Sequence, residues 1–146
     1  MSPGSKINLT KIFQPSPLPT GPDPVPKNNE DRMIGTLAHV LPIVGPLVPP
    51  HYWIFAILPP LILWQLKRGQ NLFLSAVGQE VLNFQICAAG ILTVASILSF
   101  IPLLGFVFAL AMPLAVIAVL VLMLMAALES WAGKFVRYKW IQRFVK

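Results

Sequence analysis

Apolar residues run almost without interruption through three parts of the chain, and short polar connections separate these parts. Residues 33–66, 88–101 and 103–128 contain no Asp, Glu, Lys or Arg. The last two runs approach or exceed the roughly 20 residues that a helix needs to cross the hydrocarbon core of a bilayer. Only 11% of all residues are charged, against about a quarter in soluble domains. The pattern therefore predicts an all-α integral membrane protein.

The apolar runs divide into four helices, which predicts a four-helix transmembrane bundle. The third and fourth spans are expected at residues 81–101 and 103–128. The first two are expected at residues 33–50 and 51–66, and at about 1.5 Å per residue each is barely long enough to cross. We expect them to form a short, Pro-kinked pair, with a re-entrant hairpin as the alternative. The prolines that interrupt this pair are Pro42, Pro46, Pro59 and Pro60.

The segments on either side of this predicted domain, residues 33–128, differ from it in composition. Residues 1–32 hold seven of the fifteen prolines, which favours an extended Pro-rich tail without a core. Residues 129–146 form a basic-aromatic segment whose spacing fits both a strand and a helix. The single cysteine, Cys87, cannot form a disulfide framework or a Cys-based metal site within the chain.

The eleven Lys and Arg residues all fall on one side of the predicted membrane. Four precede the first span, two lie between the second and third, and five follow the fourth, while the other two loops have none. Because positively charged loops stay in the cytoplasm, both termini are expected on the cytoplasmic side of a bacterial cell inner membrane. This topology also explains the net charge of +6 without a nucleic-acid partner.

Polar side chains gather at the start of the third predicted span, in the sequence GQEVLNFQI. Glu80, Asn83 and Cys87 share one helical stripe, Gln79 borders it, and Gln85 lies roughly opposite Asn83. Membrane helices use such amides to bond to their neighbours, so we expect the stripe to fasten the third helix to the first pair, whose prolines free backbone carbonyls. Two other interpretations stay open: Glu80 and Asn83 line a water-filled path, or Glu80 lies at headgroup depth near the positive end of its own helix.

The other candidate residues are a histidine and the C-terminal aromatic-basic group. His39 lies in the first span, where an imidazole ligates a haem or chlorophyll or forms a hydrogen bond. Because no second histidine lies at a suitable spacing within a span, we expect the hydrogen bond, and no cofactor or metal. The C-terminal group is typical of docking to anionic lipid headgroups or to a partner. Its members are Trp131, Lys134, Arg137, Tyr138, Lys139, Trp140 and Arg143.

Four segments together resemble a known family. They read DRMIGTLAHVLPIVG, ILPPLILWQLKRGQN, GQEVLNFQI and GKFVRYKWIQRFVK, and LNFQI is the most specific part. In order and spacing, residues 31–146 resemble the bacterial small multi-pass membrane proteins similar to the Tic-twenty component of the chloroplast inner-envelope translocon. The resemblance implies a four-helix membrane protein, and its plastid relatives are implicated in preprotein import.

Motifs for reaction chemistry are missing from the sequence. It contains no nucleophile elbow, phosphate-binding glycine loop, HExxH motif or carboxylate pair, so we do not expect an enzyme. We expect a non-enzymatic multi-pass subunit that scaffolds a larger membrane complex, with the lipid bilayer and other integral membrane subunits as partners. The alternative is an oligomeric channel or translocon-like pore, since one four-helix chain is too narrow to enclose a protein-sized pore.

An absorption spectrum of the purified protein tests the expectation for His39. If the imidazole only forms a hydrogen bond, the protein should have no absorption band in the visible region. A visible band that disappears in His39→Ala would show that the residue ligates a cofactor.

Overall fold

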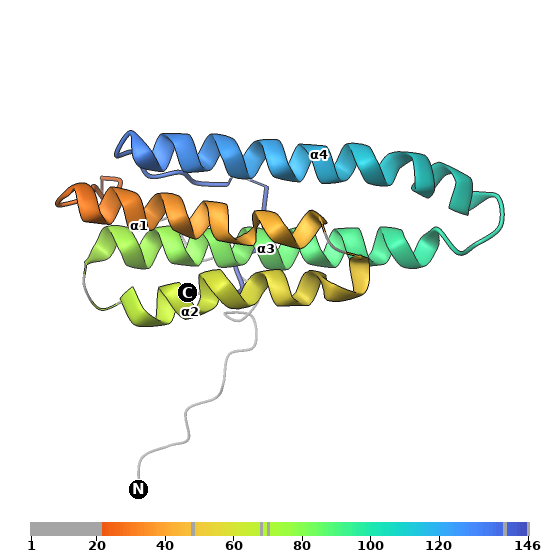
Figure 1. The fold of residues 1–146 in the computed structure, drawn as a ribbon, viewed down its shortest axis with the longest axis horizontal. Helices are drawn as coiled ribbons and strands as arrows, with labels where there is room; N and C mark the ends of the chain where they lie inside the picture. Colours follow the sequence, from red (N-terminus) through yellow and green to blue (C-terminus); the bar gives the residue numbers. More distant parts are fainter. Residues whose placement is uncertain (1–21, 48, 68, 70, 139, 146) are drawn as a thin grey trace, which may run out of the picture.

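The chain folds into helices, which confirms the predicted all-α class. The structure is a computed structural model that describes residues 22–47, 49–67, 69, 71–138 and 140–145, and within these ranges it contains no β-strand. Figure 1 shows the four α-helices side by side along the long axis, with α1 packed on α3 and α4, and α2 on α3. In chain order the elements are α1 (Asn29–Val40), the 3₁₀ helices η2 (Leu41–Leu47) and η3 (Pro50–Ile57), α2 (Leu58–Lys67), α3 (Leu72–Leu98) and α4 (Leu104–Trp131).

The first apolar pair is built from two mixed helices. α1 begins after Asn28, whose side chain accepts a hydrogen bond of 2.8 Å from the Asp31 amide, and it gives way to η2 at Leu41. η3 passes directly into α2 in the same manner. Proline donates no hydrogen bond to a helix interior and is tolerated best in the first turn. Pro42 and Pro46 lie in η2, and Pro59 and Pro60 lie in the first turn of α2.

The second pair consists of two long helices joined by a short turn. α3 begins at Leu72, well before the predicted start at residue 81, because the Asn71 side chain accepts a hydrogen bond of 2.8 Å from the Leu74 amide. Glu80 therefore lies inside the helix, and the interpretation that it lies at the positive end of its own helix is wrong. Both α3 and α4 are long and apolar enough to cross a membrane, and α4 contains Pro113.

Two small hydrophobic cores hold the helices together, and residues beyond α4 pack against both. The first core has buried members from α1 and α3: Ile34, Ala38, Phe73, Leu74, Val77 and Val81, with Leu63 and Phe135 packed against them. The second joins α3 to α4: Phe84, Ala88 and Met123, with Ile43, Val119, Tyr138 and Ile141 packed against them. In contrast, α4 carries many exposed apolar side chains, such as Phe106 at 73% and Leu114 at 69% exposure.

A left-handed glycine ends α4 and turns the chain back along the bundle. Gly133 has a φ of +82°, and the amides of Gly133 and Lys134 donate to the carbonyls of Ser130 and Glu129, both at 3.0 Å. This is the Schellman arrangement, in which a left-handed residue lets the last carbonyls of a helix find donors. Residues 134–145, called the C-terminal strap below, then run back beside α4 and cross α3 (Figure 1).

The two segments predicted outside the bundle have different outcomes. Residues 1–21 of the predicted Pro-rich tail lie outside the described residues, and α1 begins within its last positions, at Asn29. The predicted C-terminal segment begins inside α4, which ends at Trp131. In its described residues, 134–138 and 140–145, the strap is neither strand nor helix, so neither of the two local patterns is realised.

Replacing Gly133 tests the turn on which the strap depends. An L-residue in the left-handed region costs about 1–2 kcal/mol, and a Cβ at Gly133 would lie 3.2 Å from Arg32 Nε. Gly133→Ala should therefore lower the thermal midpoint of the detergent-solubilised protein by several degrees. Gly90→Ala is the matched control, because a Cβ there meets nothing within 4 Å and alanine favours a helix. An equal loss in both variants would contradict the role of the turn.

Candidate functional site

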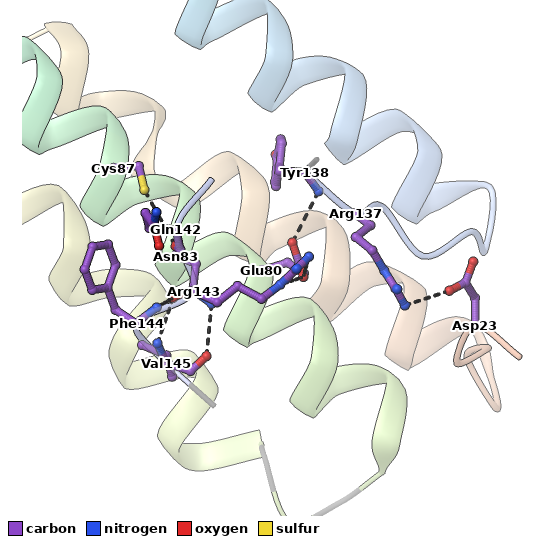
Figure 2. Close-up of polar contacts among 10 residues, drawn as sticks. All are labelled: Asp23, Glu80, Asn83, Cys87, Arg137, Tyr138, Gln142, Arg143, Phe144 and Val145. Atoms are coloured by element: carbon purple, nitrogen blue, oxygen red, sulfur yellow. Dashed lines mark hydrogen bonds and ion pairs between the residues drawn. The ribbon is translucent and has the colours of Figure 1, made fainter. Parts of the chain in front are cut away.

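Buried polar side chains of α3 and the C-terminal strap form one connected cluster, centred on Glu80. Figure 2 shows Glu80 between the Arg143 guanidinium and the Tyr138 backbone. Glu80 Oε1 accepts hydrogen bonds from Arg143 Nη2 at 2.9 Å and from Nε at 3.1 Å, and Oε2 accepts one from the Tyr138 amide at 3.2 Å. The Glu80 side chain is only 9% exposed and that of Arg143 is 21% exposed. A carboxylate at this depth needs such a partner, because an unpaired buried charge is costly.

Asn83, one helical turn beyond Glu80, binds the end of the strap through both atoms of its amide. Its Oδ1 accepts hydrogen bonds from the backbone amides of Phe144 and Val145, both at 2.7 Å, and its Nδ2 donates to the Val145 carbonyl at 3.0 Å. The residue is 1% exposed. An asparagine side chain offers two donor and two acceptor positions, so Asn83 supplies the strap with the partners that a neighbouring β-strand would supply.

Aromatic and sulfur contacts extend the cluster. The Tyr138 ring stacks on Phe84 of α3, with ring centroids 4.3 Å apart and planes 19° apart. Burial, and secondarily the Glu80 carboxylate, raises the pKa of Tyr138 well above its usual value, so this hydroxyl stays neutral at physiological pH. Cys87 Sγ also lies 3.7 Å from the Gln142 carbonyl of the strap.

The cluster corrects the partner that the sequence predicts for the polar stripe. Glu80 and Asn83 direct these bonds to the strap, not to the first helix pair. The physical reason is that the strap has no helical ladder to satisfy its peptide groups. Gln85 Nε2 points instead to α4, where it lies 3.4 Å from Met123 Sδ, and Gln79 is half-buried beside Glu80.

His39 is buried in α1 and forms a hydrogen bond within its own helix. Its Nδ1 lies 2.9 Å from the Gly35 carbonyl, so Nδ1 carries the proton and donates. Two buried atoms nearby, His39 Nε2 and Ser130 Oγ, have no hydrogen-bond partner among the described residues. Within the same residues, no three His, Cys, Asp or Glu side chains gather to hold a metal ion. The expectation that His39 binds no cofactor stays a prediction.

Two of the predicted docking residues point inward. Tyr138 and Arg143 face α3 and take part in the cluster, while the expectation that they contact lipid or a partner stays a prediction. Their partners, the Phe84 ring and the Glu80 carboxylate, are themselves buried and hold them there. Trp131 and Trp140 are 60% and 95% exposed. Lys139 lies outside the described residues.

The chain's five acidic side chains all have partners within the chain. Two of these partners, Lys134 and Arg137, are also predicted docking residues. Apart from Glu80, these contacts lie near the charged end of the bundle and involve more exposed groups, so they contribute little to stability. Glu129 pairs with Lys134 at 3.0 Å, Asp23 with Arg137 at 3.0 Å, and Glu30 with Lys67 at 3.6 Å, while Asp31 accepts the Lys27 amide at 2.8 Å. The bonds of Glu80 and Asn83 to the strap are called the clasp below, because they hold the strap on α3.

The contact between the strap and the polar stripe of α3 is the feature that sequence reasoning did not predict. Glu80 is the only acid between Asp31 and Glu129, and a lone carboxylate among apolar residues signals that some cation must approach it. That signal does not tell which of the eleven Lys and Arg residues does so, because Arg143 lies far from Glu80 along the chain.

Comparison with known protein families gives one match. A model described as the magnetosome magnetite crystal formation protein family (MamF and MmsF) matches residues 30–145, which include all four α-helices except the first residue of α1, together with the strap. No curated protein and no solved structure shows a significant match.

This match overturns the resemblance to the Tic-twenty-like proteins, which was wrong. The first two of the four segments on which the resemblance rested consist mainly of apolar residues around a few polar ones. A bilayer restricts spanning segments to such compositions, so short stretches of this kind recur in unrelated multi-pass proteins.

Substitutions in the cluster test its role as a clasp. Asn83→Leu should leave the Phe144 and Val145 amides and the Val145 carbonyl without partners, at a cost of roughly 1–3 kcal/mol for each group that stays buried. We expect a lower thermal midpoint in detergent and faster tryptic cleavage after Arg137 and Arg143. Glu80→Gln should also lower the midpoint, because the amide can still accept from Tyr138 but no longer neutralises the Arg143 guanidinium.

Gln79→Leu is the matched control for these substitutions, since it also replaces an amide by leucine on α3 but at a half-buried position outside the clasp. It should leave both the thermal midpoint and the cleavage rate unchanged. Equal effects of Gln79→Leu and Asn83→Leu would mean that the strap is not held by the Asn83 amide.

Proposed function

This chain belongs to the magnetosome magnetite crystal formation protein family, and from this premise we propose that it is a non-enzymatic, multi-pass subunit of the magnetosome membrane. In this proposal it scaffolds a membrane protein complex that takes part in magnetite crystal formation. The observation that carries the proposal is the family match over residues 30–145, joined to two helices with the length and hydropathy of membrane spans.

Helix lengths support four spans. α3 has 27 residues and α4 has 28, so each measures about 40 Å at about 1.5 Å per residue, against a hydrocarbon core of about 30 Å. A 3₁₀ helix rises about 2.0 Å per residue. Without its polar first turn, α1 contributes residues 33–40, so α1 and η2 extend about 26 Å, and the 8 residues of η3 and 10 of α2 extend about 31 Å. The 3₁₀ segments lengthen the first pair, which favours full spans over a re-entrant hairpin.

The charge distribution supports one orientation in the membrane, and that orientation favours a role through partners over direct binding of iron. Under the positive-inside rule, both termini and the connection between α2 and α3 face the cytoplasm. The opposite turns, near residue 49 and at residues 99–103, then face the compartment in which the crystal grows. Residues 33–66 and 81–128 contain no Asp or Glu, and carboxylates are the usual protein ligands of hard metal ions. The lumenal turns therefore suit an indirect role better than direct binding of iron by acids.

The surface of α4 suits contacts within the membrane. Its exposed apolar side chains, among them Phe106, Leu114 and Leu128, extend over the whole helix. Such a surface packs against lipid or against other integral subunits, including a second copy of the chain. The scaffold would use it together with the N-terminal tail.

An oligomeric pore, the alternative function, receives less support. A conduction path would need the polar stripe of α3 to face water. Glu80 and Asn83 are instead 7% and 1% exposed and are bonded to the strap. A pore would therefore have to form from other surfaces, between several chains.

Deletion of the protein in a magnetite-forming host tests the proposal. Crystal size or number should change in electron micrographs, and the wild-type chain should restore them. Asn83→Leu should restore them less well than Gln79→Leu, because it releases the strap. Solubilisation of the magnetosome membrane in mild detergent should recover the protein with stoichiometric partners. Unchanged crystals in the deletion strain, or a protein recovered alone from that membrane, would contradict the scaffold.

A further inference from the structure

The C-terminal strap turns its charged side chain inward and its aromatic rings outward. A segment that covers a water-facing surface would show the reverse orientation. Its last residues alternate between two faces: Ile141, Arg143 and Val145 are partly buried, and Trp140, Gln142 and Phe144 are exposed. Trp140 is 95% exposed and Phe144 is 62% exposed. The cation thus points inward to Glu80 while two large aromatic rings point outward. Water would favour the reverse, since aromatic area gains from burial and charge from solvation.

Five of the strap's peptide groups find partners in α3 side chains, which is the kind of satisfaction that irregular chain inside a bilayer requires. Lipid offers no hydrogen bonds, so non-helical backbone at membrane depth must be satisfied by protein. The amides of Tyr138, Phe144 and Val145 donate to Glu80 and Asn83 (Figure 2). Two strap carbonyls also accept hydrogen bonds from α3 side chains. An aqueous strap would not need this, because water would serve the same groups.

The strap also reaches deeper than a headgroup layer. α3 starts at Leu72, at the end of the bundle where the charged residues lie. At about 1.5 Å per residue, Glu80 is about 12 Å and Asn83 about 16 Å along the helix from that start. The headgroup layer on one side of a bilayer is only about 5–8 Å thick. With the start of α3 at the outer edge of the headgroup layer, residues bonded to Asn83 lie at the level of the acyl chains.

We propose that the outer face of the strap, formed by Trp140 and Phe144, is a lipid-binding surface that dips into the cytoplasmic leaflet and contacts phospholipid acyl chains. The inference rests on the proposed function in one respect, namely that α3 and α4 span the bilayer. Continuity with the spanning surface supports lipid as the occupant. The inner residues Tyr138 and Ile141 pack with Val119 and Met123 of α4, and α4 is exposed and apolar on either side of them.

The chain is well suited to a labelling test, because Cys87 is its only cysteine. On a Cys87→Ser background, which keeps a donor for the Gln142 carbonyl, single cysteines replace Trp140 or Phe144 in the full-length protein. Each is spin-labelled after reconstitution into phospholipid vesicles. Collision rates with oxygen, which partitions into lipid, are compared with those of a water-soluble nickel chelate. Leu114→Cys, about 15 Å along α4 from its start, and Val25→Cys near the N-terminus are the controls, since these positions are 69% and 73% exposed.

Labels at 140 and 144 should give an oxygen-to-nickel ratio several-fold above that at Val25 and close to that at Leu114. A ratio equal to that at Val25, with a high ratio at Leu114, would overturn the immersed strap and leave the spanning helices intact. A low ratio at Leu114 would overturn the spanning premise and the strap with it. Labels at 140 and 144 that both reagents fail to reach would show a protein contact, from a second copy or another subunit, and would also overturn the lipid surface.

Discussion

The peptide groups of the C-terminal strap must find hydrogen-bond partners beside a bundle that is almost entirely apolar, and two side chains of α3 supply them. Glu80 and Asn83 accept hydrogen bonds from three strap amides, and Asn83 donates one to a strap carbonyl. The Glu80 carboxylate also neutralises the strap's Arg143. Because unsatisfied buried polar groups are costly, the strap and the polar stripe depend on each other. Without the strap, the stripe would be an uncompensated carboxylate and amide on an apolar helix.

Because the strap is held on α3, its side chains also pack against both hydrophobic cores. Phe135 packs against the core between α1 and α3, and Tyr138 and Ile141 pack against the core between α3 and α4. The strap can reach both only because Gly133 reverses the chain at the end of α4. A segment whose composition is typical of docking to headgroups or to a partner is therefore packed as part of the bundle, with Tyr138 and Arg143 in contact with α3.

The family match gives these features a biological setting in magnetite crystal formation. The chain's acids are all engaged with neighbouring groups, and most of its charged residues lie at one end of the bundle. The proposed role in organising other membrane components would use the exposed surfaces of α4 and the strap.

Local sequence determined the helical class, the two long apolar helices and the polar stripe, because composition and helical spacing act over a few neighbouring residues. It also predicted the helix bounds approximately, although α3 starts at Leu72, after the Asn71 cap, and not at residue 81. Tertiary structure alone decided what the stripe binds, since Glu80 and Arg143 are 63 positions apart and any of eleven cations satisfies the sequence pattern. It also decided which face of the strap is outward. An irregular segment has no period of its own, so its orientation is set by the partners that its backbone finds.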